Sequence, residues 1–166
     1  MSKSLARVTA ALHAAGLDAT PLEMPGETRT ALQAAQAAGC ALDQIVKSIL
    51  FRGQDSGKLF LFLTAGGNQV DAARAAALAG EAMGRAGADE VRAVTGFAIG
   101  GVAPLGHLTA LPTWFDPRLL EFPLIWGAAG TPRHIFPIDP QALLRVTGAR
   151  VAAFTADPGH NPGAQM

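Results

Sequence analysis

The sequence of 166 residues has little cysteine, little charge and little lysine. Its one cysteine, Cys40, excludes an internal disulfide and any metal site built from several cysteines. Only 16% of the residues are charged, and 13 basic side chains balance 13 acidic ones. This balance argues against a protein that holds long stretches of nucleic acid on a basic surface. Lysine occurs only as Lys3, Lys47 and Lys58, so the position of each lysine matters.

Segments that would direct the chain to a membrane are also absent from the sequence. The first residues lead directly into an amphipathic pattern, without the basic and apolar regions of a signal peptide. The longest apolar run, over residues 60–70, is interrupted by Gly66, Gly67 and Asn68 and is far shorter than the roughly 18 residues of a membrane span. We therefore expect a cytoplasmic protein without membrane contact.

Familiar catalytic motifs are missing as well. The glycines at 96, 100, 101 and 106 fit neither a phosphate-binding P-loop nor the dinucleotide-binding pattern GxGxxG. We find no GxSxG motif, no Ser-His-Asp arrangement, no paired carboxylates in an apolar setting and no histidine pair with metal-ligand spacing. We expect no metal and no cofactor. Catalysis here would depend on positioning, backbone donors and groups of the substrate.

The hydrophobic pattern predicts one mixed α/β domain over residues 1–154, followed by a flexible C-terminal tail over residues 155–166. Helical spacing and caps predict helices over residues 4–15, 30–38, 71–79, 89–94 and 139–146. Short β-branched and aromatic runs predict strands over residues 19–22, 45–51, 59–64, 109–115, 124–129, 134–138 and 149–154. Strands and helices do not alternate regularly, so a Rossmann sheet is excluded.

Lys47 is the first candidate functional residue. In a strand over residues 45–51 it shares one face with Ile45, Ile49 and Phe51, while Ser48 lies on the other face. The lysine stem could simply pack while its ammonium reaches the rim of the sheet. Alternatively, the cation stands at the mouth of an apolar pocket and binds a phosphate or a carboxylate.

Two further segments are rich in small residues. The first, residues 96–106, contains four glycines and Pro104, and it is either a tight turn or a row of backbone N–H groups aimed at an oxyanion or carbonyl. The second, residues 126–134, ends in a turn that brings up Thr131, Arg133 and His134. It is either an ordinary hairpin turn or the floor of a compact pocket.

Taken together, three segments resemble the YbaK/ProX family of aminoacyl-tRNA deacylases, which are related to the editing domain inserted in bacterial prolyl-tRNA synthetases. The segments are Ile-Val-Lys-Ser-Ile-Leu-Phe (45–51), Thr-Gly-Phe-Ala-Ile-Gly-Gly-Val-Ala-Pro-Leu-Gly-His (95–107) and Trp-Gly-Ala-Ala-Gly-Thr-Pro-Arg-His-Ile-Phe (126–136). The resemblance covers residues 20–154. It implies a mixed, largely antiparallel, barrel-like sheet surrounded by helices.

The resemblance also implies roles for individual residues. The resemblance implies that the loop from Gly100 to Pro104 holds the ester carbonyl through its backbone N–H groups. Lys47 then neutralises a phosphate or anchors the terminal adenosine, and a water hydrolyses the ester. The implied catalytic residues are Lys47, Gly100, Gly101, Val102 and Pro104. The implied substrate-binding residues are Thr28, Ser48, Gly130, Thr131 and His134.

The resemblance implies a freestanding trans-editing deacylase that acts on the 3′ end of a tRNA mischarged with a small amino acid, with a synthetase or an elongation factor as a possible partner. Two alternatives remain open. The chain could be a module that binds an aminoacyl group or a nucleotide without hydrolysing it, or a structural partner that docks on a synthetase. The sequence itself does not distinguish them.

Overall fold

The structure is a computed structural model that describes residues 2–157. Its α-helices are α1 (Lys3–Ala14), α2 (Ala31–Ala38), α3 (Ala72–Ala79), α4 (Ala88–Thr95) and α5 (Pro140–Thr147), with 3-10 helices η1 (Leu42–Gln44) and η2 (Pro117–Glu121). Its strands are β1 (Leu22–Glu23), β2 (Val46–Gly53), β3 (Leu59–Ala65), β4 (Met83–Arg85), β5 (Thr113–Phe115), β6 (Ile125–Ala128), β7 (His134–Ile138) and β8 (Arg150–Val151). Four α-helices begin at side chains that accept a first-turn N–H, those of Ser2, Thr30, Asp71 and Asp139.

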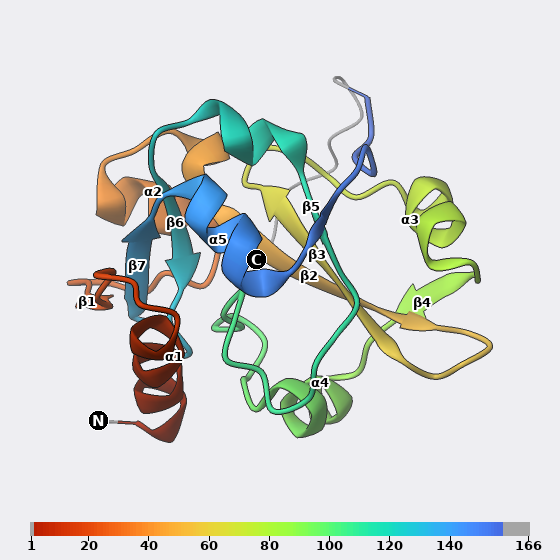
Figure 1. Ribbon diagram of the computed structural model, residues 1–166, viewed down its shortest axis with the longest axis horizontal. Coiled ribbons are helices and arrows are strands. Elements are labelled where there is room, and N and C mark those ends of the chain that lie inside the picture. Colours follow the sequence, from red (N-terminus) through yellow and green to blue (C-terminus); the bar gives the residue numbers. More distant parts are fainter. Residues whose placement is uncertain (1, 158–166) are drawn as a thin grey trace.

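The strands form two sheets. The larger has the order β4-β2-β3-β5-β8, and the smaller has the order β1-β7-β6. Pairing is antiparallel except between β3, β5 and β8, so the prediction of a mixed and largely antiparallel arrangement is confirmed. Figure 1 shows β2 and β3 crossing the middle of the molecule, with β1, β6 and β7 on one side and α3 and β4 on the other.

The prediction of barrel-like closure is wrong. The five-stranded sheet ends in β4 at one edge and β8 at the other, and the two edges do not pair. Both edge strands are very short, with three and two residues, which leaves too few backbone groups to close the sheet. Among the described residues, the backbone pairing between the two sheets is an isolated bridge between Ile45 and Trp126, and side chains of both sheets pack in the largest hydrophobic cluster.

Several predicted strand boundaries also differ from the structure. The strands predicted over residues 19–22, 109–115 and 149–154 shorten or shift to β1, β5 and β8. Ahead of β5 the chain turns back to α4, because the N–H groups of Leu108 and Thr109 bond the carbonyls of Thr95 and Val94 at 3.2 and 3.1 Å. Strand β4 was not predicted, since its three residues acquire strand geometry only by pairing with β2.

Two described residues of the predicted C-terminal tail contact the rest of the domain. Thr155 bridges Val70, and the Asp157 carboxylate pairs with Arg74 at 3.2 Å. The rest of the predicted tail, residues 158–166, lies outside the described residues. No helix among the described residues is long and apolar enough to cross a membrane.

The central hairpin is buried on both faces. One face of β2 supplies Val46 and Leu50 to the largest hydrophobic cluster, and the other face supplies Ile49 and Phe51 to an aromatic cluster around Phe62. Every residue of β3 is buried. The alternation predicted for residues 45–51 is therefore confirmed, and it decides the direction in which each neighbouring polar residue of β2 points.

Candidate active site

The first polar residue of β2, Lys47, is only 1% exposed. Its Nζ donates a hydrogen bond to the backbone oxygen of Asn68, in the loop after β3. Burial lowers the pKa of Lys47 from its ordinary 10.5 to about 8, opposed by the nearby charges of Asp116 and Asp43. The same Asp116 accepts hydrogen bonds from the Asn68 side chain at 2.9 Å and from the Ala65 N–H at 3.0 Å. Lys47 therefore holds the loop after β3 against the start of β2.

The three segments singled out in the sequence meet in the structure. Ile45, just before β2, pairs with Trp126 of β6. The loop after α4 runs along β6 and the turn that follows it. A Cβ on Gly101 would lie 3.2–3.3 Å from the backbone of Thr131, and a Cβ on Gly127 would lie 3.1 Å from the Pro104 ring. The absence of side chains at these glycines allows the loop to lie directly on β6 and its turn.

Some backbone N–H groups of this loop are hydrogen-bonded within the protein, and others are not. The Gly101 N–H donates to the Ala98 carbonyl at 3.0 Å and closes a tight turn. In residues 2–157, no partner is found for the N–H groups of Gly100, Val102 and Ala103. Val102 and Ala103 are buried. Buried backbone donors are nearly always paired, so unpaired ones in a short loop point to an acceptor from outside the chain.

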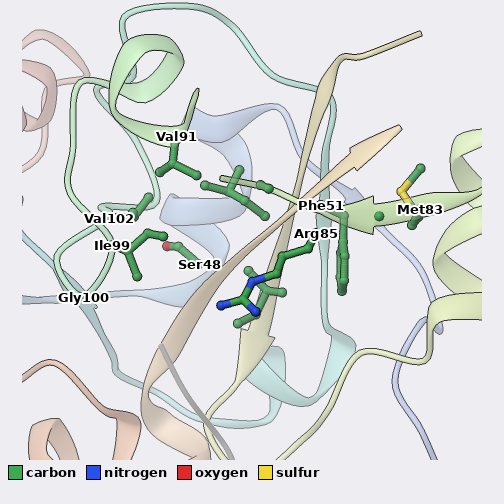
Figure 2. Close-up of a pocket in the computed structure, with 12 residues that line it drawn as sticks. Ser48, Phe51, Met83, Arg85, Val91, Ile99, Gly100 and Val102 are labelled. Carbon is green, nitrogen blue, oxygen red and sulfur yellow. The ribbon is translucent and has the colours of Figure 1, made fainter. Parts of the chain in front are cut away.

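Gly100 and Val102 line a cavity of about 360 Å³ between β2, β4, α4 and the loop. Figure 2 shows Ile99, Gly100 and Val102 on one side of it and Phe51 and Met83 on the other, with Ser48 and Arg85 between. The remaining lining residues are Ile49, Leu50, Gly84, Ala86 and Val91. The cavity is therefore mostly apolar with few polar groups, as small-molecule sites are.

Ser48 gives this cavity an unsatisfied polar group. Its hydroxyl is buried, the residue is 7% exposed, and Oγ has no hydrogen-bond partner within residues 2–157. Leaving a buried hydroxyl unpaired costs about 1–3 kcal/mol, so such a group calls for an explanation. Its position in the cavity with Gly100 and Val102 supplies one, because a ligand there would accept or donate the missing hydrogen bond.

The turn after β6 forms a second polar group of residues. Thr131 Oγ1 lies 2.6 Å from Nδ1 of His134 and also accepts the Arg133 N–H at 3.1 Å. Buried Thr28 braces the turn, because its N–H and its hydroxyl both donate to the Pro132 carbonyl, at 2.7 and 3.2 Å. These residues do not line the cavity described above, but the Gly101–Thr131 contact places their turn directly beside the loop.

Comparison with known proteins identifies the family. Residues 25–146 match the family model of the aminoacyl-tRNA editing domain. The chain belongs to this family. The editing domain is similar to a solved structure described as a proposed trans-editing enzyme for prolyl-tRNA synthetase, with 46% identity, 95% of this chain and 99% of that chain covered, and a TM-score of 0.88.

Two other relatives carry no assigned activity. The crystal structure of hypothetical protein APE2540 is 28% identical, with 90% of this chain and 99% of that chain covered and a TM-score of 0.83. The uncharacterized protein YwhH of Bacillus subtilis (strain 168) is 28% identical over 129 residues, which are 78% of this chain and 82% of that protein. The family resemblance inferred from the three segments is thus confirmed.

The editing domain brings together part of the predicted site. Ser48, Gly100 and Val102 share the cavity, and Gly101 and Pro104 hold their loop against β6. Arg85 lines this cavity, whereas the Lys47 ammonium donates to the backbone oxygen of Asn68. Gly130 has a φ of +92°, and it lies so close to Ser4 that a Cβ on Gly130 would be 2.9 Å from the backbone carbonyl oxygen of Ser4.

Sequence reasoning missed Arg85 and Arg29. Arg85 is exposed, lines the cavity and makes no side-chain hydrogen bond or ion pair within residues 2–157. Arg29, paired with Glu27 at 3.4 Å, lies over Gly100. Both belong to short segments without a motif, so no sequence signal marked them. No group of three or more His, Cys, Asp or Glu that could hold a metal ion is found in the described part of the editing domain.

Proposed function

We propose that this editing domain is a freestanding trans-editing deacylase, which hydrolyses the ester between a small amino acid and the 3′-terminal adenosine of a mischarged tRNA. The overall reaction is balanced by water alone. The oxygen of a water adds to the ester carbonyl carbon, the bond from that carbon to the ribose oxygen breaks, and the ribose oxygen takes up a proton. No cofactor enters this reaction.

The observation that carries the proposal is the pair of unpaired N–H groups of Gly100 and Val102 beside an apolar cavity. When water adds to an ester, negative charge develops on the carbonyl oxygen. Fixed backbone donors at that oxygen stabilise the transition state, and removal of one such donor from an enzyme typically costs about 10²–10³ in kcat. The site therefore needs no side-chain nucleophile, provided that it holds the ester at these donors and admits a water.

The cavity and the turn after β6 supply the other parts of the proposal. Ser48 offers the substrate a hydrogen bond, and Arg85 offers a cation. Thr131 and His134, held by Thr28 and Gly130, bound the neighbouring side of the loop, where the amino-acid side chain would lie. A compact site can hydrolyse small wrong amino acids that a synthetase fails to reject, because one methylene is worth only about 1–3 kcal/mol in binding.

In this proposal Lys47 acts by position. It joins the loop after β3 to β2, and the next residue of β2 is Ser48. Loss of Lys47 would leave the Asn68 carbonyl without this donor and Asp116 without a neighbouring cation, and so would shift the strand that carries Ser48. Direct binding of a tRNA phosphate by Lys47 would require its ammonium to leave Asn68.

The net charge of zero bears on the partners. A protein that reads only the last nucleotide and its ester needs few cations, so we expect weak affinity of the isolated protein for tRNA. A synthetase or an elongation factor would then present the substrate, and the reaction would belong in the cytoplasm with them. Nanomolar, strongly salt-dependent binding of uncharged tRNA by the isolated protein would contradict this expectation.

The decisive test measures hydrolysis of tRNAs mischarged with Ala, Ser, Thr, Pro or a non-protein analogue. Wild type should hydrolyse at least one of them, Lys47→Ala and Gly101→Val should lose most of that activity, and Arg145→Met, on the exposed side of α5, should keep it. Circular dichroism verifies that each variant is folded. Absence of hydrolysis by folded wild type would overturn the proposal. If calorimetry then shows binding of a nonhydrolysable aminoacyl-adenosine, the protein is a binding module.

A further inference from the structure

Helix α1 lies outside residues 25–146, which match the family model, and yet it contacts both loops of the candidate site. Its apolar side buries Leu5, Val8 and Leu12 in the main core. At its start, the Ser4 hydroxyl donates to the Gly96 carbonyl at 3.3 Å, and the Ser4 backbone abuts Gly130. The helix therefore joins the glycine-rich loop to the turn after β6.

Arg7, one turn further along α1, holds the two ends of the glycine-rich loop with one side chain. Its Nε donates to the Gly106 carbonyl at 2.9 Å, and its Nη2 donates to the Gly96 carbonyl at 2.8 Å. The guanidinium is planar, and its donors have a fixed relative geometry. The two contacts therefore set the distance between loop residues that are ten positions apart in the chain.

The same guanidinium is coupled to the middle of the loop. Its Cζ lies 4.7 Å from the centroid of the buried Phe97 ring, and Phe97 meets His107 edge to face at 5.9 Å. Nε2 of His107 lies 2.7 Å from the Ala103 carbonyl. A carbonyl oxygen can only accept, so Nε2 carries the hydrogen. Burial lowers the pKa of His107 and the charge of Arg7 lowers it further, opposed by the hydrogen bond to the Ala103 carbonyl.

From these contacts we propose that Arg7 is a positioning residue, which fixes the loop from Gly96 to Gly106 so that the N–H groups of Gly100 and Val102 stay aimed at the substrate carbonyl. The catalytic role of the loop rests on the proposed function; the hold of Arg7 on the loop does not. Arg7 itself touches no substrate in this arrangement. Arg7 acts on the loop in two ways. It bonds the carbonyls at the two ends of the loop, and it packs on Phe97, which contacts His107, whose ring bonds the Ala103 carbonyl.

Arg7→Met tests the proposal, because methionine keeps an apolar stem against Phe97 but removes both donors. We expect kcat to fall about 10- to 100-fold with KM within about threefold of wild type, because donors to the carbonyl act mainly in the transition state. Arg7→Lys keeps the charge, but a single ammonium cannot span both carbonyls. The kcat of Arg7→Lys should therefore lie between those of wild type and Arg7→Met. Arg145→Met is the matched control and should leave both constants unchanged.

Hydrogen exchange provides a readout that does not depend on activity. In Arg7→Met, amides of residues 96–107 should exchange faster, while amides of the β2–β3 hairpin keep wild-type rates. If Arg7→Met does not fold, Arg7→Lys is measured instead. Unchanged exchange in the loop, or a uniform increase across the whole domain, overturns the proposal, as does wild-type kcat with a loosened loop. If wild type hydrolyses no substrate, the proposed function fails, and exchange alone decides whether Arg7 holds the loop.

Discussion

Lys47 and Ser48 are neighbours in β2, and their side chains serve opposite faces of the strand. The Lys47 ammonium bonds the Asn68 carbonyl beside Asp116, whereas the Ser48 hydroxyl is unpaired and lines the cavity with Gly100 and Val102. One residue thus anchors the strand, and the other faces the candidate site. Substitution of Lys47 should therefore affect stability, whereas substitution of Ser48 should affect activity.

Lys47 should make stability rise with pH above about 8. In the folded protein its pKa is about 8, while in the unfolded chain it is near 10.5. Between these values the unfolded chain binds more protons, so the free energy of unfolding increases with pH, by at most on the order of 3 kcal/mol. Urea denaturation at pH 7 to 10.5 should show wild type gaining stability relative to Lys47→Met. A constant or falling difference across that window would contradict this assignment.

Ser48→Ala should separate stability from activity. The substitution removes a buried hydroxyl that has no partner, so the free energy of unfolding should stay within about 1 kcal/mol of wild type or increase. If the hydroxyl serves the substrate, kcat/KM should fall about 3- to 10-fold, the value of one hydrogen bond. Urea denaturation and deacylation assays measure the two quantities. A marked loss of stability with unchanged kcat/KM would assign Ser48 a purely structural role.

Gly101→Ala should disturb the loop because a Cβ there would press against the Thr131 backbone at 3.2–3.3 Å. The loop must shift by a few tenths of an ångström, which should lower kcat about tenfold while the fold persists. Gly26→Ala is a suitable control, because a Cβ at Gly26 meets nothing within 4 Å. Equal kcat values for the two variants would show that the contact between loop and turn does not matter for the reaction.

Thr131 should act through its hydroxyl. Thr131→Val keeps the shape of the side chain but removes the oxygen that bonds Nδ1 of His134 and the Arg133 N–H. We expect Thr131→Val to change the ranking of mischarged tRNAs by kcat/KM, with about 3- to 10-fold losses for preferred substrates. Thr131→Ser keeps the hydroxyl and should keep the ranking. If serine and valine behave alike, the hydrogen bond to His134 does not contribute to selectivity.

Local patterns in the sequence predicted much of the central architecture. Alternation from Ile45 to Phe51 and the turn residues 52–57 correctly predicted the β2–β3 hairpin and the two buried faces of β2. The glycines and proline of the loop correctly singled out a segment whose backbone lies close to another. Such features depend on the periodicity and conformational freedom of neighbouring residues, which the sequence contains directly.

The short strands, the edges of the sheet and the position of Arg85 could not be predicted from local sequence patterns. Strand β4 exists only because Met83–Arg85 pairs with the end of β2, and the barrel-like sheet that the family resemblance implied is an open sheet with short edges. Arg85 reaches the cavity through that pairing. Register and edges between distant segments depend on which surfaces are buried together, and short strands carry little signal of their own.

The sequence by itself determined the helices, the central hairpin, the family and the loop that carries the proposed chemistry. Only the tertiary structure decided that Ser48 and Arg85 line the cavity, that Lys47 is held by Asn68, and that Arg7 of α1 holds both ends of the loop. The physical reason is distance along the chain. A periodic pattern fixes which face of an element is apolar, but packing between segments up to about a hundred residues apart decides what each polar group meets.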